Sequence, residues 1–300
     1  MSPPESLTLN YTARRQQTIA QPTHIDGVGY WSGRPIRVSF RPAVENGGIF
    51  FVRDDLADHP VIAATAANRA ETPLRTSLQF GEHRVEMVEH VMAALHALRI
   101  DNCEVGVTAE EMPGCDGSSQ AFVDAIDQAG VAVQTTAVER LAIDRVVRVG
   151  DDQSWLEARP TSPGSGLNVE YHLDFSDHPA IGKQSLRLDV TPASFRSELA
   201  AARTFVLEEQ AASLQQKGLA LHVTCRDLLV FDDDGPIGNT LRYTDECVRH
   251  KTLDVVGDLA LAGRRIDGQV IAFRSGHRLN CELVETLLET HATTFPPLSA

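Results

Sequence analysis

The chain has 300 residues, 42% of them hydrophobic and 23% charged, a composition that excludes a disordered or fibrous protein and predicts a globular one. Its length favours two domains over one. Its formal net charge of −14 excludes non-specific binding to nucleic acid and a polybasic membrane anchor, because both need a basic surface.

The cysteines and the start of the chain predict a cytoplasmic protein. The five cysteines are odd in number and form no C-x-x-C pair, which favours a reducing compartment. The first ten residues, MSPPESLTLN, lack the basic segment and apolar core of a signal peptide. No apolar run approaches the roughly 20 residues of a membrane span. We therefore expect a soluble protein without membrane insertion, and a monomer.

The first half of the chain reads as short strands followed by two helices. Residues 1–14 are polar and are predicted to form a disordered tail. The predicted elements after it, in chain order, are strands at 36–40 and 49–52, a helix at 85–100, a strand at 103–108 and a helix at 119–130. Residues 55–80 show no clear period. A β-rich block with two helices predicts an α+β layer pair.

The second half has a similar content. Residues 131–140 are predicted to be a linker, which divides the chain into domains at 15–134 and 135–300. The predicted elements are strands at 141–149, 154–158, 168–175 and 185–190, a short helix at 194–202, a strong helix at 245–261 stopped by Gly263, a strand at 270–273 and a final helix near 280–289. The likeness of the two halves suggests a duplicated α+β fold, although no repeat is visible in the letters.

The strong helix carries a candidate metal site. His250 and Asp254 are four residues apart, so their side chains project from nearly the same side of the helix. An imidazole and a carboxylate placed in this way can bind one zinc ion. Asp258 lies one turn further on and could orient a neighbouring group. An ordinary exposed His–Asp pair explains the same spacing, and both interpretations remain open.

A second candidate lies early in the helix at 85–100. His90 could bind a metal ion while Glu89, which points about 100° away, reaches a water molecule beside it. Glu86, four residues before His90, is a rival ligand, or a favourable charge near a helix N-terminus. His277 follows Ser275-Gly276, where a strand is predicted to end in a turn. This position is typical of a functional site at the edge of a sheet, but also of a turn residue without a functional role.

Taken as an ordered set, these motifs resemble one family. The set comprises Gly27-Val28-Gly29 with Ser32-Gly33, Val88-Glu89-His90, Pro113 with Asp116-Gly117-Ser118, Asp174-Phe175 with His178-Pro179-Ala180-Ile181, Arg203-Thr204-Phe205, Arg249-His250-Lys251 with Asp254 and Gly257-Asp258, and Ser275-Gly276-His277 with Asn280. It is similar to that of the UDP-3-O-acyl-N-acetylglucosamine deacetylases, the zinc enzymes of lipid A synthesis. The resemblance spans roughly residues 15–290.

The resemblance implies two similar domains, each a mixed β-sheet layered with a helix pair, with the active site at their interface. It also implies hydrolysis of an acetamide on an N-acetylated UDP-amino sugar. The implied roles are Zn²⁺ ligands for His90, His250 and Asp254; general base for Glu89; oxyanion stabilisation for Thr204; proton donor for His277, held by Asp258; and substrate contacts for Lys251 and Phe205. Three protein ligands leave a fourth position open, as in catalytic zinc sites.

Several positions depart from the family's pattern. Tyr30-Trp31 stand where Leu-His is usual, near the expected path of the acyl chain. Glu86-Met87 replace the Ser/Thr pair that caps the Glu-His helix, and residues 222–226 lack the usual Gly-Gly-Ser. Asp144 occupies the place of a basic residue near the nucleotide phosphate. An alternative is therefore a divergent deacetylase of another N-acetyl sugar or amide with altered acyl or nucleotide recognition. A catalytically silent, zinc-binding regulatory protein is a third hypothesis.

Overall fold

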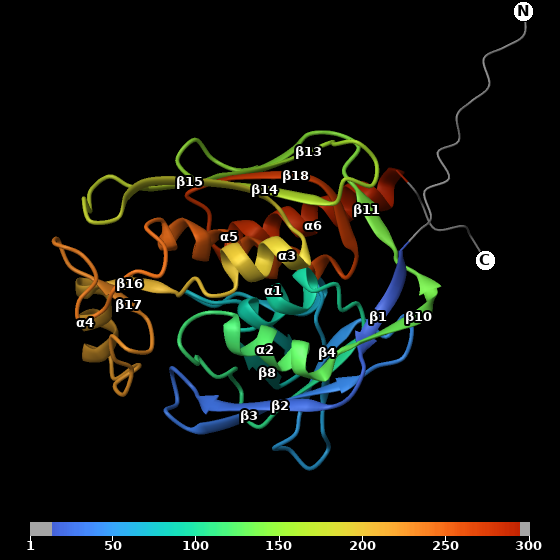
Figure 1. Ribbon diagram of the computed structural model, residues 1–300, viewed down its shortest axis with the longest axis horizontal. Coiled ribbons are helices and arrows are strands. Elements are labelled where there is room, and N and C mark those ends of the chain that lie inside the picture. The colour runs from blue at the N-terminus through green and yellow to red at the C-terminus, as the bar shows by residue number, and fades with distance from the viewer. Residues whose placement is uncertain (1–13, 295–300) are drawn as a thin grey trace, which may run out of the picture.

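The computed structural model describes residues 14–294, and side chains as far as His291. The predicted disordered tail lies outside this range except for Arg14. Figure 1 shows four layers: a sheet, two layers of helices and a second sheet. The prediction of an α+β protein is confirmed. Among the described residues, no helix combines the length and apolar character that crossing a membrane requires.

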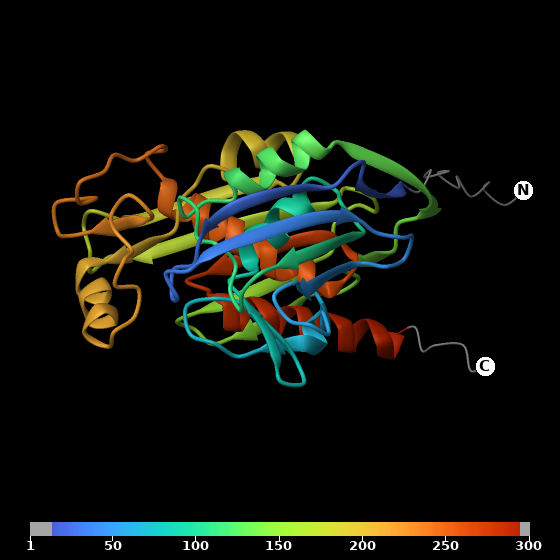
Figure 2. The same cartoon turned by 90° about the horizontal axis from the view of Figure 1, so that it is seen from below.

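The lower layer in Figure 1 is a five-stranded sheet from the first half of the chain. Its strands, in spatial order, are β2 (Thr23–Val28), β3 (Pro35–Pro42), β9 (Cys103–Val107), β4 (Ile49–Arg53) and β5 (Val61–Ala63). All neighbouring strands are antiparallel except β9 and β4. In β3, Ile36, Val38 and Phe40 are buried while their neighbours are not, as expected for a sheet with one solvated face. Figure 2 shows this sheet from below, with helices behind it.

A small antiparallel sheet contacts the lower layer through β5. Its strands are β6 (Arg69–Ala70), β7 (Ser77–Phe80) and β8 (His83–Glu86), and a 3₁₀ turn, η1 (Ala66–Asn68), precedes them. β6 and β7 lie in the segment for which the sequence shows no clear period. β8 leads directly towards the first helix, so this small sheet sets where that helix begins.

The upper layer is a six-stranded sheet from the second half. Its strands are β12 (Val147–Gly150), β13 (Trp155–Arg159), β18 (Arg265–Phe273), β14 (Leu167–Phe175) and β15 (Gly182–Asp189), with β11 (Arg140–Ala142) also paired to β18. The pairs β14–β18 and β11–β18 are parallel. In β14, Val169, Tyr171 and Leu173 are buried and alternate with more exposed polar residues.

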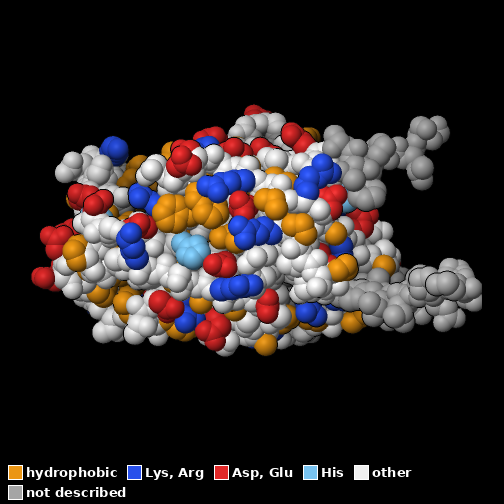
Figure 3. Space-filling view, turned by 90° about the horizontal axis from the view of Figure 1, so that it is seen from above, with side chains coloured by type: hydrophobic (Ala, Val, Ile, Leu, Met, Phe, Trp, Pro, Cys, Tyr) orange, Lys and Arg blue, Asp and Glu red, His pale blue; other side chains and the backbone are white. Residues whose placement is uncertain are grey.

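The outer face of the upper sheet mixes basic, acidic and hydrophobic side chains (Figure 3). Opposite charges on adjacent strands pair with each other, as in Arg148–Glu157 across β12 and β13 and Lys183–Asp174 across β15 and β14. The charges of this face are therefore compensated locally, and the buried polar groups described below lie on the other side of the sheet.

Four long helices separate the two sheets (Figure 1): α1 (Glu89–Ala97), α2 (Gln120–Ala129), α5 (Glu246–Leu259) and α6 (His277–Thr294). α2 and α1 contact each other, α1 packs on α5, and α5 and α6 pack under the upper sheet. Gly257 of α5 faces the backbone carbonyl of Glu89, and a Cβ at this position would collide with that carbonyl. The glycine thus allows the start of α1 to lie directly against α5.

Three further pieces complete the fold. β1 (Arg15–Ile19) pairs with β10 (Val131–Ala137) at one side of the molecule. A turn of helix, α3 (Pro192–Ser194), continues as π-helix η2 (Phe195–Leu199). The segment that carries β16 (Phe205–Leu207), α4 (Glu208–Gln216) and β17 (Leu229–Phe231) projects at one end (Figure 1).

The structure corrects several sequence predictions. The strand predicted at 270–273 already begins at Arg265, as β18. The helix predicted at 85–100 begins at Glu89, because residues 83–86 form β8 and Met87 adopts a φ of 61°. The predicted linker at 131–140 is mostly β10, paired with β1. The strand predicted at 141–149 is two strands, β11 and β12, that pair with different neighbours. The final helix starts at His277 rather than near 280. α5, by contrast, agrees with its prediction, ending in a 3₁₀ turn, η3 (Ala260–Ala262), before Gly263.

Candidate active site

The contact between α1 and α5 brings the predicted ligands together. His90 lies in the first turn of α1, and His250 and Asp254 lie one turn apart on α5. Nε2 of His250 is 3.3 Å from Oδ1 of Asp254, and Nε2 of His90 is 3.7 Å from the same oxygen. One ligand atom from each residue lies within 4.8 Å of the others. The two imidazoles meet edge to face at 4.9 Å between ring centroids.

The chemistry of this cluster fits a metal ion. Oδ1 of Asp254 is buried and has no hydrogen-bond partner, although it points at two imidazoles. Burial and the neighbouring His250 lower the pKa of His90 to about 3, and burial lowers the pKa of His250. Both imidazoles are therefore neutral at pH 7 and have a lone pair for a metal. Nδ1 of His250 lies 3.1 Å from the carbonyl oxygen of Ala202, which leaves Nε2 as the ligand atom.

The second oxygen of Asp254 is held by Lys251. Nζ of Lys251 donates to Oδ2 at 2.6 Å. Burial favours the neutral amine, but the carboxylate of Asp254 raises the pKa of Lys251 above its ordinary value. Burial alone would raise the pKa of Asp254, yet the ammonium group of Lys251 helps to lower it well below its usual range. Asp254 is therefore ionised, with one oxygen neutralised and the other available.

Glu89 lies beside the cluster at the first position of α1. Its Oε2 accepts a hydrogen bond from the backbone N–H of Thr76 at 3.0 Å, and the side chain is almost fully buried. Burial raises the pKa of Glu89 to about 7, although the nearby His277 acts in the opposite direction. A carboxylate with a pKa near neutrality is suited to accept and release a proton.

Glu86, the rival ligand, lies elsewhere. It belongs to β8 and forms ion pairs with Arg75 at 2.7 Å and with Arg84 at 2.9 Å. The helical spacing to His90 on which the rival interpretation depended does not exist, because α1 starts only at Glu89. His96, in the last turn of α1, is half-buried.

His277 approaches the cluster from the first turn of α6. Its Nδ1 is 2.9 Å from Oδ2 of Asp258, and its Nε2 is 3.9 Å from Oδ2 of Asp254. Burial by itself favours neutral imidazole, but the carboxylates of Asp258, Asp254 and Glu89 raise the pKa of His277 to about 9. His277 is therefore an imidazolium at neutral pH and can donate a proton.

Two further residues complete the surroundings of Asp258, and sequence reasoning assigned neither a role. The hydroxyl of Thr76 donates to Oδ1 of Asp258 at 2.5 Å, and the side-chain amide of Asn280 donates to Oδ2 at 2.8 Å. Asn280 has a sequence signal, since it follows His277 by one helical turn. Thr76 has none, because it stands in the segment without a clear period.

Thr204 and Phe205 follow the segment that touches the cluster. Thr204 comes two residues after Ala202, the carbonyl partner of His250, and its N–H donates to the carbonyl of Gly117 at 2.8 Å. The ring of Phe205 meets Phe175 edge to face at 5.6 Å between centroids. Both residues therefore lie where the projecting segment leaves the body of the protein.

The departures at residues 30 and 222 meet at a cavity of about 350 Å³. The hydroxyl of Tyr30 donates to the carbonyl oxygen of Asp227, and Nε2 of His222 lies 2.7 Å from the carbonyl oxygen of Gly29. Cys115, Val28 and Val223 also line the cavity. Trp31 instead lies under the guanidinium of Arg75, 4.4 Å from the ring centroid. Tyr30 and His222 thus join the loop at 29–33 to the segment at 219–228.

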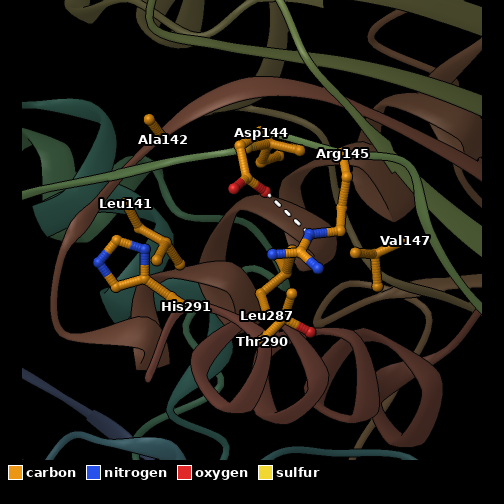
Figure 4. A pocket seen from close by; sticks show the side chains of 9 residues that line it. Leu141, Ala142, Asp144, Arg145, Val147, Leu287, Thr290 and His291 are labelled. Carbon is orange, nitrogen blue, oxygen red and sulfur yellow. Dashed lines mark hydrogen bonds and ion pairs between the residues drawn. The ribbon is translucent and has the colours of Figure 1, made fainter. Parts of the chain in front are cut away.

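Asp144 lines a different, much smaller pocket between β11, β12 and α6 (Figure 4). Its Oδ1 accepts from Nε of Arg145 at 3.2 Å, so a basic group accompanies it. Leu287 of α6 lies in the same pocket, ten residues after His277 and hence about 15 Å further along the helix axis. Asp144 is therefore well separated from the cluster of His90, His250 and Asp254.

Comparison with known proteins agrees with this geometry. The family model described as LpxC, UDP-3-O-acyl N-acetylglycosamine deacetylase, matches residues 16–289. The chain is 42% identical over 275 residues to the UDP-3-O-acyl-N-acetylglucosamine deacetylases of Brucella ovis, Brucella canis and Brucella abortus, with 91% of this chain and 95% of each relative covered. The resemblance inferred from the ordered motifs is confirmed, and the chain belongs to the family of UDP-3-O-acyl N-acetylglycosamine deacetylases.

Proposed function

We propose that this protein hydrolyses the acetamide of a UDP-3-O-acyl-N-acetylglucosamine in a zinc-dependent reaction. The observation that carries the proposal is the free, buried Oδ1 of Asp254, which faces two neutral imidazoles beside Glu89 and His277. Membership of the deacetylase family and the names of the Brucella relatives support the choice of substrate.

His90, His250 and Asp254 would hold the zinc ion. When bound there, zinc would polarise the acetamide carbonyl and lower the pKa of a nearby water molecule. Lys251 orients Asp254, and the carbonyl of Ala202 orients His250. Two histidines and one carboxylate are a typical ligand set of catalytic zinc sites.

Glu89 and His277 then divide the proton transfers. The carboxylate of Glu89 accepts a proton from the attacking water, whose oxygen forms the new bond to the acetamide carbon. Thr204 stabilises the developing charge on the carbonyl oxygen. Nε2 of His277 donates a proton to the amine nitrogen as the C–N bond breaks, while Asp258 keeps the ring charged and oriented. The products are acetate and the free amino sugar.

We further propose where the rest of the substrate lies. Lys251 and Phe205 contact the sugar, and the acyl chain enters the cavity beside Tyr30, whose lining by Val28 and Val223 suits a hydrocarbon. The bonds by which Tyr30 and His222 join the two loops at this cavity favour a second candidate, a deacetylase with changed acyl preference.

The site is proposed to lie between two α+β domains, the first from residue 15 through β10 and the second from β11 onward. Glu89 and His90 belong to the first domain. The proposed site residues on α5 and α6 belong to the second. All five cysteines are free, which supports our placing of the protein in the reducing cytoplasm.

Purified protein with known zinc content tests the proposal directly. We expect acetate release from the acylated UDP-sugar, little release from acyl-free UDP-N-acetylglucosamine, loss of activity after chelation, and recovery on addition of zinc. Equal rates with and without the acyl group would favour the second candidate. Zinc binding without hydrolysis of either compound would contradict the enzymatic proposal.

A further inference from the structure

We infer that Thr76 is a positioning residue that holds the proposed base and the proposed acid in register, an inference that rests on the function proposed above. Thr76 immediately precedes β7 and is 2% exposed. It belongs to none of the predicted motifs. Its backbone nevertheless bonds to Glu89, the proposed base, and its side chain bonds to Asp258, which holds the proposed acid. Thr76 is therefore a physical link between the two.

The backbone of Thr76 holds the start of α1. Its N–H donates to Oε2 of Glu89 at 3.0 Å, and its carbonyl accepts from the N–H of Val88 at 3.2 Å. The side chain of Val88 does not cap α1. These two bonds with Thr76 therefore help to fix the position of the first turn. The position of the Glu89 carboxylate therefore depends on where Thr76 lies.

The hydroxyl of Thr76 fixes Asp258. It donates to Oδ1 at 2.5 Å and lies 3.2 Å from Nδ1 of His277. Because Oδ1 is occupied by this donor, Oδ2 remains for His277 and Asn280. Without the hydroxyl, the carboxylate of Asp258 would be held through Oδ2 alone and could turn further about its Cβ–Cγ bond. His277 would then lose the fixed partner that aims its Nε2 at the departing amine.

Two substitutions of Thr76 separate the role of its hydroxyl from the packing of its side chain. Thr76→Val keeps the shape but removes the donor, and Thr76→Ser keeps the donor. We expect Thr76→Val to lower kcat by about 10- to 100-fold, the usual effect of losing a group that orients an active-site residue. KM and zinc content should stay within about twofold, because the ligands and substrate contacts remain. Thr76→Ser should recover most of kcat.

A double-mutant cycle tests whether Thr76 acts through Asp258. In an Asp258→Ala background, Thr76→Val should change kcat by less than about twofold, because no carboxylate is left to orient. Thr18→Val serves as a matched control: Thr18 is a buried threonine whose hydroxyl accepts from the N–H of Ala43 in another part of the fold. It should alter thermal stability without changing kcat.

The outcomes distinguish this inference from the function on which it rests. An inactive wild-type protein overturns both. An active wild type whose Thr76→Val variant keeps its kcat, or loses the same factor with and without Asp258, overturns the positioning role alone. Thr76→Ala removes the hydroxyl without adding a methyl group, so it provides the same comparison if the valine variant does not fold.

Discussion

Two regions of this protein are held together in different ways. In the cluster around Asp254, each side chain projects from a helix, is nearly fully buried and has at least one close polar neighbour. At the cavity beside Tyr30, two loops meet and are joined by the side chains of Tyr30 and His222, each bonded to a backbone carbonyl. Two of the departures from the family's pattern, those at Tyr30 and at His222–Val223, fall in the second region. Loops held by few bonds tolerate change, whereas a buried polar network does not.

The largest expected effect comes from the proposed base. Glu89→Gln keeps the volume of the side chain but removes proton acceptance, so we expect kcat to fall by about 10²- to 10⁴-fold while zinc content is unchanged. Glu86→Gln is the matched control, because Glu86 lies in β8 and its carboxylate pairs with Arg75 and Arg84. Its kcat should stay within about threefold. Equal function in cells that carry the Glu89 substitution would favour the silent, metal-binding hypothesis.

A smaller effect, visible mainly as a pH shift, is expected at Asp258. His277 must be protonated to act as an acid, so activity falls as pH rises through its pKa of about 9. Burial alone lowers that pKa, and Asp258 supplies the largest opposing effect. Asp258→Asn should therefore move the basic limb of the kcat profile to lower pH and reduce kcat by about 10- to 100-fold. A basic limb that does not move would contradict the assignment of His277 as the acid.

The smallest effect is expected in the loop region. Tyr30→Phe removes the hydrogen bond to Asp227 but keeps the ring against the cavity, so the change in kcat/KM should be about 2- to 10-fold, with KM carrying most of it. Tyr243→Phe, which removes a hydroxyl that bonds to Ser197 instead, is the control. A loss from Tyr30→Phe as large as that from Asp258→Asn would show that the two regions do not differ in the way described.

Much of the helical framework was predictable from the sequence. α5 has a long apolar period and a clear stop at Gly263, so the spacing of His250 and Asp254 could be read directly. The alternation in β14 was equally plain. The start of α1 was not predictable, because Val85 and Val88 are both buried and continue the helical period although Val85 belongs to a strand. Buried positions favour apolar residues in strands and helices alike, so the sequence pattern does not show where β8 ends and α1 begins.

The candidate site, too, was predictable from the sequence only in part. The sequence by itself predicted which residues carry metal-binding and proton-transfer chemistry, since the family that the ordered motifs resemble implies roles for His90, His250 and Glu89 without reference to distance. Only the tertiary structure decided that Oδ1 of Asp254 has no hydrogen-bond partner, that Glu86 pairs with Arg75, and that Thr76 bonds to both Glu89 and Asp258. These facts depend on contacts between segments up to 182 residues apart. No local pattern encodes the contact of Thr76 with Asp258, because it joins two segments that are distant in the sequence.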